Sequence, residues 1–354
     1  MSENFEIFDR PTFDFEERPT EGTWDADLLR RGCPHPFQSS AFADQYPQLV
    51  STAAYQPRRL YIGSSGTQIG QCLVAISRRK TVQWLYGPVV DAPHMASYGA
   101  IVEALLKYLA AQGVRAVDFA STQVAYGNKA PTIGPFPGCY AAETCFVDLD
   151  PTIEDILRSC DSSVRKNARK CAEAGVSVEF TSDVSAVPEY LALLSDFRKR
   201  LGFPMPPFHP TASSMRRFAG ESTAMEIAFA RVGGVAVAAM GYVVFGSVVT
   251  EIAAAESADY VKLKLPANDL IKISAIERFK KRGTKFYDIT GGKKEGISSK
   301  EQAIRRFKQK FGKESADYYC IEQRYLTSGS LAHQFQVAAL RTTRVVGRLL
   351  LPKA

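Results

Sequence analysis

The sequence lacks the cysteine patterns of metal sites and disulfide frameworks. Its seven cysteines are an odd number, they are scattered, and none belongs to a C-x-x-C motif. A cysteine lies close to a histidine in one place alone, Cys33-Pro34-His35. This usage argues against a zinc site and against a set of disulfide bonds, and it favours a reducing compartment.

Histidines and long apolar runs are also scarce. There are only four histidines, and no spacing of Ser, His and Asp suggests a catalytic triad. The longest apolar run, residues 235–249, is shorter than the roughly 18–20 residues that cross a membrane. Its valines predict two buried strands instead. The start of the chain is acidic and has no apolar core, so we expect no secretory signal and a cytoplasmic location.

What is present is the composition of a globular protein with one strongly basic region. The 354 residues are 45% hydrophobic and 23% charged, which suits one large domain or two ordinary ones. The net charge is +7. Residues 278–313 hold 13 Lys and Arg against 3 Asp and Glu, a balance of +10, so the rest of the chain is about −3. A local excess of this kind indicates an anionic partner or a solvated basic face.

The order of the predicted elements in the first half recurs in the second. Each half reads as a hairpin, a further strand, a loop, a long helix and a strand, at residues 59–62, 68–77, 83–90, 98–112 and 117–120, and at 227–231, 235–245, 247–255, 266–282 and 286–289. Asp118 and Asp288 each lie five residues after the glycine that ends the helix. A repeat over about 170 residues predicts two copies of one domain. We expect an α/β or α+β fold, with a mostly antiparallel mixed sheet flanked by helices in each copy.

The second copy continues into a stretch that the first lacks. After the strand at 286–289 we expect a break at Gly291–Gly292, a lysine-rich loop, and a helix that starts at Ser298 or Ser299. An apolar stripe follows on this helix, formed by Ile304, Phe307 and Phe311. Lys308 lies within or beside that stripe. It is either a lysine whose stem packs on apolar groups or a charge placed for catalysis.

The order hairpin, strand, helix, strand resembles the GNAT-type N-acyltransferase fold, here in tandem. That resemblance implies an acyl-CoA site at a glycine-rich turn, where backbone N–H groups at the start of the long helix hold the pyrophosphate. The corresponding residues 260–267 contain no glycine. We therefore predict the same fold with a different acyl donor.

Two motifs extend the resemblance. They are R-K-N-A-R-K-C-A-E-A-G-V at residues 165–176, and Y-D-I-T-G-G with A-I-R-R-F-K-Q-K-F-G between residues 287 and 312. W-L-Y-G-P-V-V at 84–90 and P-F-Q-S-S-A-F at 36–42 fit the same pattern. The chain resembles the FemABX family of aminoacyl-tRNA-dependent peptidyltransferases, which have two such domains. The resemblance implies transfer of an amino acid to an amine of a cell-wall precursor, peptide or related metabolite. No other cofactor and no metal is implied.

The resemblance also implies site residues. Lys308 matches the family's F-K position and is predicted to stabilise the oxyanion of the reaction. Asp288 is predicted to accept a proton or orient the acceptor, and Tyr242 to supply a hydroxyl. The residues predicted to bind substrate are Arg198, Arg200, Phe203, His209, Tyr287 and Phe307. Those predicted to bind tRNA phosphates are Arg165, Lys166, Arg169, Lys170, Arg305 and Arg306. For the tyrosines a place in the core is the alternative, and for the helix 162–175 an ordinary wet face.

We expect a mobile tail at 1–22, a first domain at 23–150, a second domain with the site at 151–316, and a segment at 317–354 that returns to the first domain. The basic, apolar residues 341–354 either pack there or touch an anionic membrane surface. We expect a monomer. An N-acyltransferase that uses acyl-CoA or another thioester, and a non-catalytic RNA- or ligand-binding module, are the alternative functions.

Overall fold

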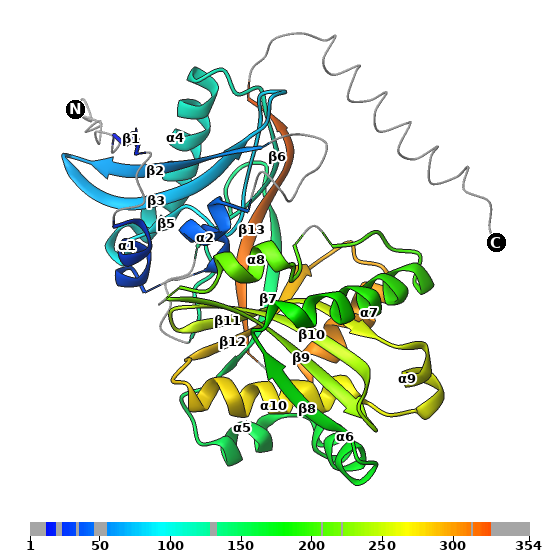
Figure 1. The fold of residues 1–354 in the computed structure, drawn as a ribbon. Coiled ribbons are helices and arrows are strands. Elements are labelled where there is room, and N and C mark those ends of the chain that lie inside the picture. The colour runs from blue at the N-terminus through cyan, green and yellow to red at the C-terminus, as the bar shows by residue number, and fades with distance from the viewer. Residues whose placement is uncertain are drawn as a thin grey trace, which may run out of the picture.

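The structure is a computed structural model and describes residues 12–18, 23–32, 35–45, 55–127, 133–206, 208–220, 222–312 and 314–326. Within these ranges one 13-stranded sheet has the order β1-β2-β3-β4-β6-β13-β7-β12-β11-β10-β9-β8, with β5 paired to β3 (Figure 1). The pairs β4–β6 and β11–β12 are parallel and the other pairs are antiparallel. The predicted α+β architecture with a mostly antiparallel mixed sheet is confirmed.

The elements have the following bounds. The strands are β1 (Asp14–Glu17), β2 (Gln56–Ser64), β3 (Thr67–Ile76), β4 (Thr81–Trp84), β5 (Val89–Val90), β6 (Ala116–Ser121), β7 (Tyr140–Asp148), β8 (Ser177–Thr181), β9 (Thr223–Val232), β10 (Val235–Phe245), β11 (Val248–Glu256), β12 (Phe286–Lys293) and β13 (Glu314–Tyr325). The α-helices are α1 (Trp24–Arg30), α2 (Ser40–Ala43), α4 (Tyr98–Ala111), α5 (Ile153–Ser159), α6 (Ser162–Glu173), α7 (Val187–Arg200), α8 (Ala212–Arg217), α9 (Ala258–Leu263), α10 (Ala267–Lys281) and α11 (Ser299–Gln309). Short 3-10 turns are η1 (Pro36–Gln38), η2 (Ala92–Ser97) and η3 (Val184–Ala186).

The repeat predicted from the sequence is visible in the sheet. In the first half the hairpin β2–β3 leads through β4 and α4 to β6, which pairs in parallel with β4. In the second half the hairpin β9–β10 leads through β11 and α10 to β12, which pairs in parallel with β11. Strand β13 lies between β6 and β7 and joins the halves. The domain boundaries at 150 and 316 stay predictions, because one hydrogen-bonded sheet runs through both halves.

Two local predictions need correction. The strand predicted at 83–90 is two strands, because the chain turns at Tyr86, whose φ is +54°, and Gly87. Strand β12 runs through Gly291 and Gly292 to residue 293 instead of breaking there. A Cβ at Gly291 would lie 1.6 Å from the carbonyl oxygen of Glu143, so this glycine permits close strand pairing. Helix α6 starts at Ser162, and Asp161 is its N-cap. Residues 36–43 form the 3-10 turn η1 and the single turn α2, whose N-cap is Ser39.

Hydrophobic clusters cover both faces of the sheet. Helices α5, α6 and α10 pack on one face of the second half, and α7 and α8 pack on the other (Figure 1). Helix α4 covers the first half. Strand β1, within the predicted tail, pairs with β2. In the described part of the chain no helix has the length and apolarity to cross a membrane. The predicted contact of residues 341–354 lies outside the described residues.

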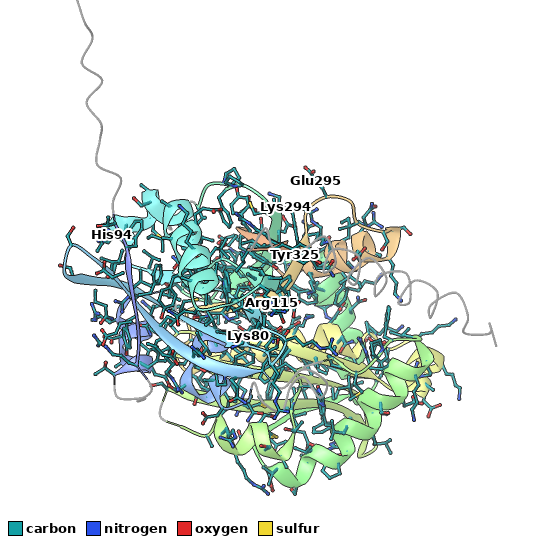
Figure 2. All side chains as sticks on the ribbon, turned by 90° about the horizontal axis from the view of Figure 1, so that it is seen from above. Lys80, His94, Arg115, Lys294, Glu295 and Tyr325 are labelled. Carbon is teal, nitrogen blue, oxygen red and sulfur yellow. The ribbon has the colours of Figure 1, made fainter. Side chains whose placement is uncertain are left out.

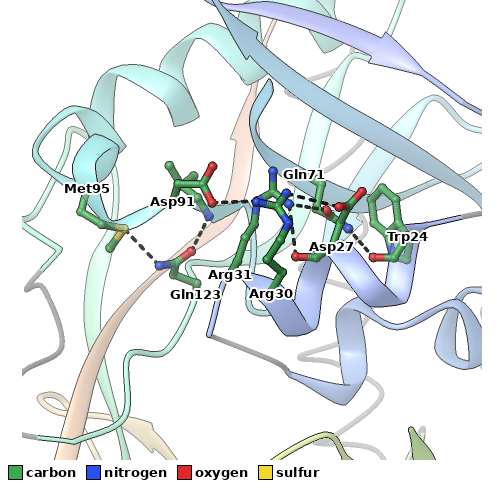
Figure 3. A network of polar contacts seen from close by, with 9 residues as sticks. Trp24, Asp27, Arg30, Arg31, Gln71, Asp91, Met95 and Gln123 are labelled. Carbon is green, nitrogen blue, oxygen red and sulfur yellow. Dashed lines mark hydrogen bonds and ion pairs between the residues drawn. The ribbon is translucent and has the colours of Figure 1, made fainter. Parts of the chain in front are cut away.

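A buried arginine attaches α1 to the first half of the sheet (Figure 3). Arg31 donates to the carbonyl oxygen of Asp27 and to Gln71 Oε1, and its Nε lies 3.3 Å from Asp91 Oδ1. Gln71 in turn donates to the carbonyl oxygen of Trp24. Burial lowers the pKa of Arg31, opposed by the Asp91 carboxylate. This network stabilises the first half and does not reach the cavity described below.

Candidate active site

A cavity of about 200 Å³ lies between α11 and the strands β7 and β12. Its lining from the strands is Glu143, Cys145 and residues 291–293. Its lining from α11 and the turn before it is Ile297, Glu301, Ile304, Arg305 and Lys308. Lys308 and Arg305, both predicted site residues, therefore share one cavity that combines acidic, basic and apolar groups.

Local sequence explains why α11 starts where it does. Ser298 accepts a hydrogen bond from the backbone N–H of Glu301, and the Glu301 carboxylate accepts one from the backbone N–H of Ser298. This capping box confirms the predicted helix start. Figure 2 shows Lys294 and Glu295 on the turn that leads to the helix, where Lys294 pairs with Asp317 of β13. The turn and the cap together hold α11 over the end of β12.

Lys308 is placed by a bulge in β12. The pairing of β12 with β7 shifts between Asp288 and Thr290, and Thr290 has a φ of +62°. Lys308 Nζ donates to Thr290 Oγ1 at 2.7 Å. Burial lowers the pKa of Lys308, while the Glu251 carboxylate raises it and Lys272 lowers it further. The partly buried ammonium group is thus a positive charge at the wall of a small cavity.

Asp288 lies in β12, two residues before Thr290, and is not among the residues that line the cavity. Its side chain is fully buried and accepts hydrogen bonds from Tyr126, Thr144 and the backbone N–H of Thr290. His35 Nε2 lies 3.7 Å from its Oδ2. Burial alone would raise the pKa of Asp288, but the His35 ring and the hydroxyl donors hold it below its usual value. The carboxylate thus connects segments from both halves of the chain.

The two predicted tyrosines belong to a buried polar cluster. Tyr242 and Tyr287 are fully buried, and their hydroxyl oxygens are 3.4 Å apart. Tyr287 donates a hydrogen bond to Glu251, which also accepts one from Lys272. Neither Glu251 nor Lys272 was predicted from the sequence. The signal was present for Lys272, because it lies on the same helical stripe as the buried Ile276 and Phe279.

The residues predicted to bind substrate separate into two groups. Phe307 packs edge-to-face on Phe311 and against the core. The other group borders α11, because Lys300 Nζ lies 3.8 Å from the ring centroid of Phe203, which also contacts Arg198 at 5.0 Å.

Three of the predicted side chains in this region bond to backbone carbonyl oxygens of the chain itself. Arg198 donates to the carbonyl oxygen of Pro204, and Arg200 to that of Glu256. His209 Nδ1 bonds to the carbonyl oxygen of Pro206. The loop after α7 is therefore held in place by the residues that were predicted to contact the acceptor.

The basic residues predicted to bind tRNA phosphates have different surroundings. Arg165 donates to the carbonyl oxygens of Leu157, Arg158 and Cys160 at the end of α5, and Lys170 donates to that of Lys264. Arg305 Nε lies 2.5 Å from Glu143 Oε1 inside the cavity. Lys166, Arg169 and Arg306 are exposed. Arg165, Lys170 and Arg305 thus contact other groups of the chain. Lys166, Arg169 and Arg306 are the exposed basic residues of this set.

The first turn of α10 holds a buried carboxyl group, Asp269, and contacts a second one, Glu256 at the end of β11. Asp269 is buried and accepts a hydrogen bond from Asn167 at 2.6 Å, and Asn268 donates one to Glu256. Burial raises the pKa of both Asp269 and Glu256. A helix N-terminus attracts anions, and here the buried Asp269 side chain lies in the first turn of the helix. Among the described residues, no group of three or more His, Cys, Asp or Glu is arranged to hold a metal ion.

Comparisons with known proteins agree with this fold. Residues 158–309 match the family model described as "Acetyltransferase (GNAT) domain". The second half of the chain thus carries a GNAT acyltransferase domain, and the chain as a whole has a tandem GNAT fold. No curated protein matches the sequence.

Three solved structures show the tandem fold over most of the chain. FemX has a TM-score of 0.63 at 11% identity and covers 86% of this chain and 96% of its own. L-PGS from Bacillus licheniformis has a TM-score of 0.55 at 16% identity, and the match covers 94% of this chain and 98% of the L-PGS chain. A tandem GNAT protein from the clavulanic acid biosynthesis pathway has a TM-score of 0.52 at 12% identity. The match covers 90% of this chain and 100% of the other chain. The predicted fold is confirmed, and at these identities the likeness extends to the fold alone.

Proposed function

We propose that this protein is an aminoacyltransferase of the FemABX type that transfers an amino acid from aminoacyl-tRNA to an amine. The amine nitrogen attacks the ester carbon and forms a tetrahedral oxyanion. The intermediate then collapses to an amide and expels the ribose oxygen, which takes up the proton that the amine loses. The Lys308 ammonium group stabilises the oxyanion, and the cavity wall positions the reacting groups.

The residues at the N-terminus of α10 favour aminoacyl-tRNA over acyl-CoA as the acyl donor. Asp269 is 2% exposed and lies in the first turn, and residues 260–267 contain no glycine. A CoA pyrophosphate at this position would have to approach buried carboxyl groups instead of open backbone N–H groups. Aminoacyl-tRNA does not need this cradle. Its phosphates would contact the exposed Lys166, Arg169 and Arg306 instead. A cytoplasmic location and a monomer belong to the same proposal.

An N-acyltransferase that uses acyl-CoA is the second candidate, since the matching family model is that of an acetyltransferase domain. Incubation of the purified protein with labelled aminoacyl-tRNA or labelled acyl-CoA, each with a panel of amines, separates the two. Loss of ester from tRNA that is faster only when an amine is present supports our proposal. Turnover with acyl-CoA alone would contradict it. Tight RNA binding without turnover of any donor would favour a binding module.

The basic surface of α6 gives a quantitative test of tRNA binding. We expect the double variant Lys166→Glu/Arg169→Glu to weaken binding and to reduce the salt slope of log K by about 2, because two phosphate contacts are lost. Binding is measured by filter assay across a salt series. Arg78→Glu/Arg79→Glu, which changes two exposed basic residues between β3 and β4, is the matched control. An unchanged salt slope in the α6 variant would show that this helix has an ordinary solvated face that does not bind tRNA.

We also propose that the acceptor amine carries an apolar group. Four exposed hydrophobic side chains, Leu201, Phe203, Met205 and Ile304, border α11 or the loop after α7. We call these four residues the apolar rim. Ile304 also lines the cavity, and Lys300, one turn before it, contacts Phe203. Apolar side chains gathered beside a cavity are typical of a binding surface.

The apolar rim predicts a binding defect without a defect in chemistry. We expect Phe203→Ser/Met205→Ser to raise the KM for the acceptor about tenfold and to leave kcat near its normal value. The measurement is steady-state kinetics with saturating aminoacyl-tRNA. Val235→Ser is the control, because Val235 is 66% exposed at the start of β10, outside the rim. A fall in kcat with an unchanged KM would show that the rim does not bind the acceptor.

A further inference from the structure

A buried ion pair lies beneath α11, and the reaction proposed above does not use it. Glu251 of β11 is 7% exposed and Lys272 of α10 is 2% exposed. Lys272 donates to Glu251 Oε1, and the hydroxyl of Tyr287 donates to the same oxygen. Tyr242 extends the cluster through its contact with Tyr287. Four polar side chains from β10, β11, β12 and α10 thus meet in the core.

This cluster faces the segment of α11 that carries Lys308. Lys272 Nζ lies 5.9 Å from the ring centroid of Phe307 and 5.5 Å from that of Phe311. These rings precede and follow Lys308 on the helix. Because these groups are buried, a charge here acts on its neighbours more strongly than in water.

Several charged or titratable groups face Lys308 from the elements around it. They are Glu251 of β11, Lys272 of α10, Asp288 and Lys293 of β12, Glu143 and Cys145 of β7, and Glu301 and Arg305 of α11 itself. Burial lowers the pKa of Lys308, the Glu251 carboxylate opposes this most strongly, and Lys272 adds to it. The two members of the buried pair thus act on Lys308 in opposite directions.

A buried ion pair of this kind adds little to the stability of the fold. The desolvation of two buried charges costs about as much as their attraction returns, and apolar residues of similar size are often as stable. A buried pair under a cavity-lining lysine also acts on the charge of that lysine. The sign of this effect differs between the two partners.

We propose that Glu251 and Lys272 are positioning residues that set the charge state of Lys308. The Glu251 carboxylate favours the protonated form of Lys308 in its partly buried position, and the positive charge of Lys272, which pairs with that carboxylate, opposes this effect. This inference rests on the role that the proposed function gives to Lys308. The charge itself is measurable without any acyl donor, so the two proposals succeed or fail separately.

The test is competitive labelling of lysines with acetic anhydride across the pH range in which lysines titrate. The Lys308 peptide is quantified by mass spectrometry, and its labelling midpoint is compared between variants. We expect Glu251→Gln to lower the Lys308 midpoint by about one pH unit, which is a tenfold larger deprotonated fraction at a given pH. Lys272→Met should raise the midpoint, and the double variant should return it toward the normal value.

Glu226→Gln is the matched control. Glu226 is 2% exposed, pairs with Arg278 and Arg282, and lies on β9, two strands from β11. Its replacement should leave the Lys308 midpoint unchanged. If Glu251→Gln does not fold, Glu251→Asp withdraws the carboxylate by one methylene group and should lower the midpoint by a smaller amount. Shifts of the same sign in the Glu251 and Lys272 variants, or no shift in either, would overturn the proposal. Opposite shifts in a protein that turns over no aminoacyl-tRNA would support it and contradict the proposed function instead.

Discussion

Replacement of Lys308 by methionine is expected to reduce turnover by about 10²–10³-fold, the loss found when one oxyanion donor is removed. Methionine keeps an unbranched apolar stem but removes the charge at the cavity wall. The expected loss is therefore in kcat, because the ammonium acts on the oxyanion and not on the ground state. Single-turnover kinetics with labelled aminoacyl-tRNA and a saturating amine measure it.

Two further variants separate charge from packing at this position. Lys308→Ala removes both the stem and the charge, so it should lose at least as much turnover and also some stability. Gln309→Ala, at the next residue of α11, is exposed and should behave normally. Near-normal turnover of the methionine variant would show that Lys308 only packs on the apolar stripe.

Replacement of Asp288 by alanine is expected to lower the free energy of unfolding by about 3 kcal/mol or more, because each buried donor left unsatisfied costs about 1–3 kcal/mol. The side chain is fully buried and accepts from Tyr126, Thr144 and the backbone of Thr290. Its loss leaves these donors unsatisfied and separates His35 from the second half. Chemical denaturation monitored by circular dichroism measures the change.

Asp118→Ala is the natural comparison, because Asp118 holds the equivalent place in the first half. Asp118 is exposed and accepts from Tyr55 and Thr81, so its replacement should cost much less stability. If Asp288→Ala is as stable as the unchanged protein and only turnover falls, Asp288 has the proton-accepting role predicted from the sequence.

The pH dependence of the Asp288 contribution has a defined sign. The folded-state pKa of Asp288 is held below its usual value by His35, Thr144 and Tyr126, against the opposing effect of burial. The unfolded protein therefore binds the proton more readily, and the contribution of Asp288 is fully present above the ordinary carboxyl pKa. The stability difference between the unchanged protein and Asp288→Asn should shrink as the pH falls toward the folded-state pKa. A difference that grows on acidification would contradict this assignment.

The start of α11 illustrates how much of the site the sequence predicted. Ser298 and Glu301 form a capping box within four residues, so the helix start was readable. The placement of Lys308 beside the apolar stripe was equally local. Arg305 was predicted to bind tRNA, but it lies 2.5 Å from Glu143, a residue 162 positions earlier in the chain. That pairing depends on the register between β7 and β12, which no local pattern reveals.

Equivalent sequence positions did not imply equivalent surroundings. Asp118 and Asp288 follow equivalent helices and glycines in the two halves, yet Asp118 is exposed and Asp288 is fully buried. The difference arises because β12 pairs with β7 and receives Tyr126 and His35 from the first half. The surroundings of Arg165 could not be predicted from the sequence either, because its hydrogen bonds to the end of α5 depend on how two helices meet.

By itself, the sequence determined the order of strands and helices, their repetition, and the basic stretch that contains Lys308. These features follow from periodicity, caps and charge within short segments. Only the tertiary structure decided that β13 joins the halves, that Glu251 and Lys272 meet beneath α11, and that Asp288 is buried behind the cavity. Such contacts join residues far apart in the chain, and their energies depend on burial that exists only once the sheet is assembled.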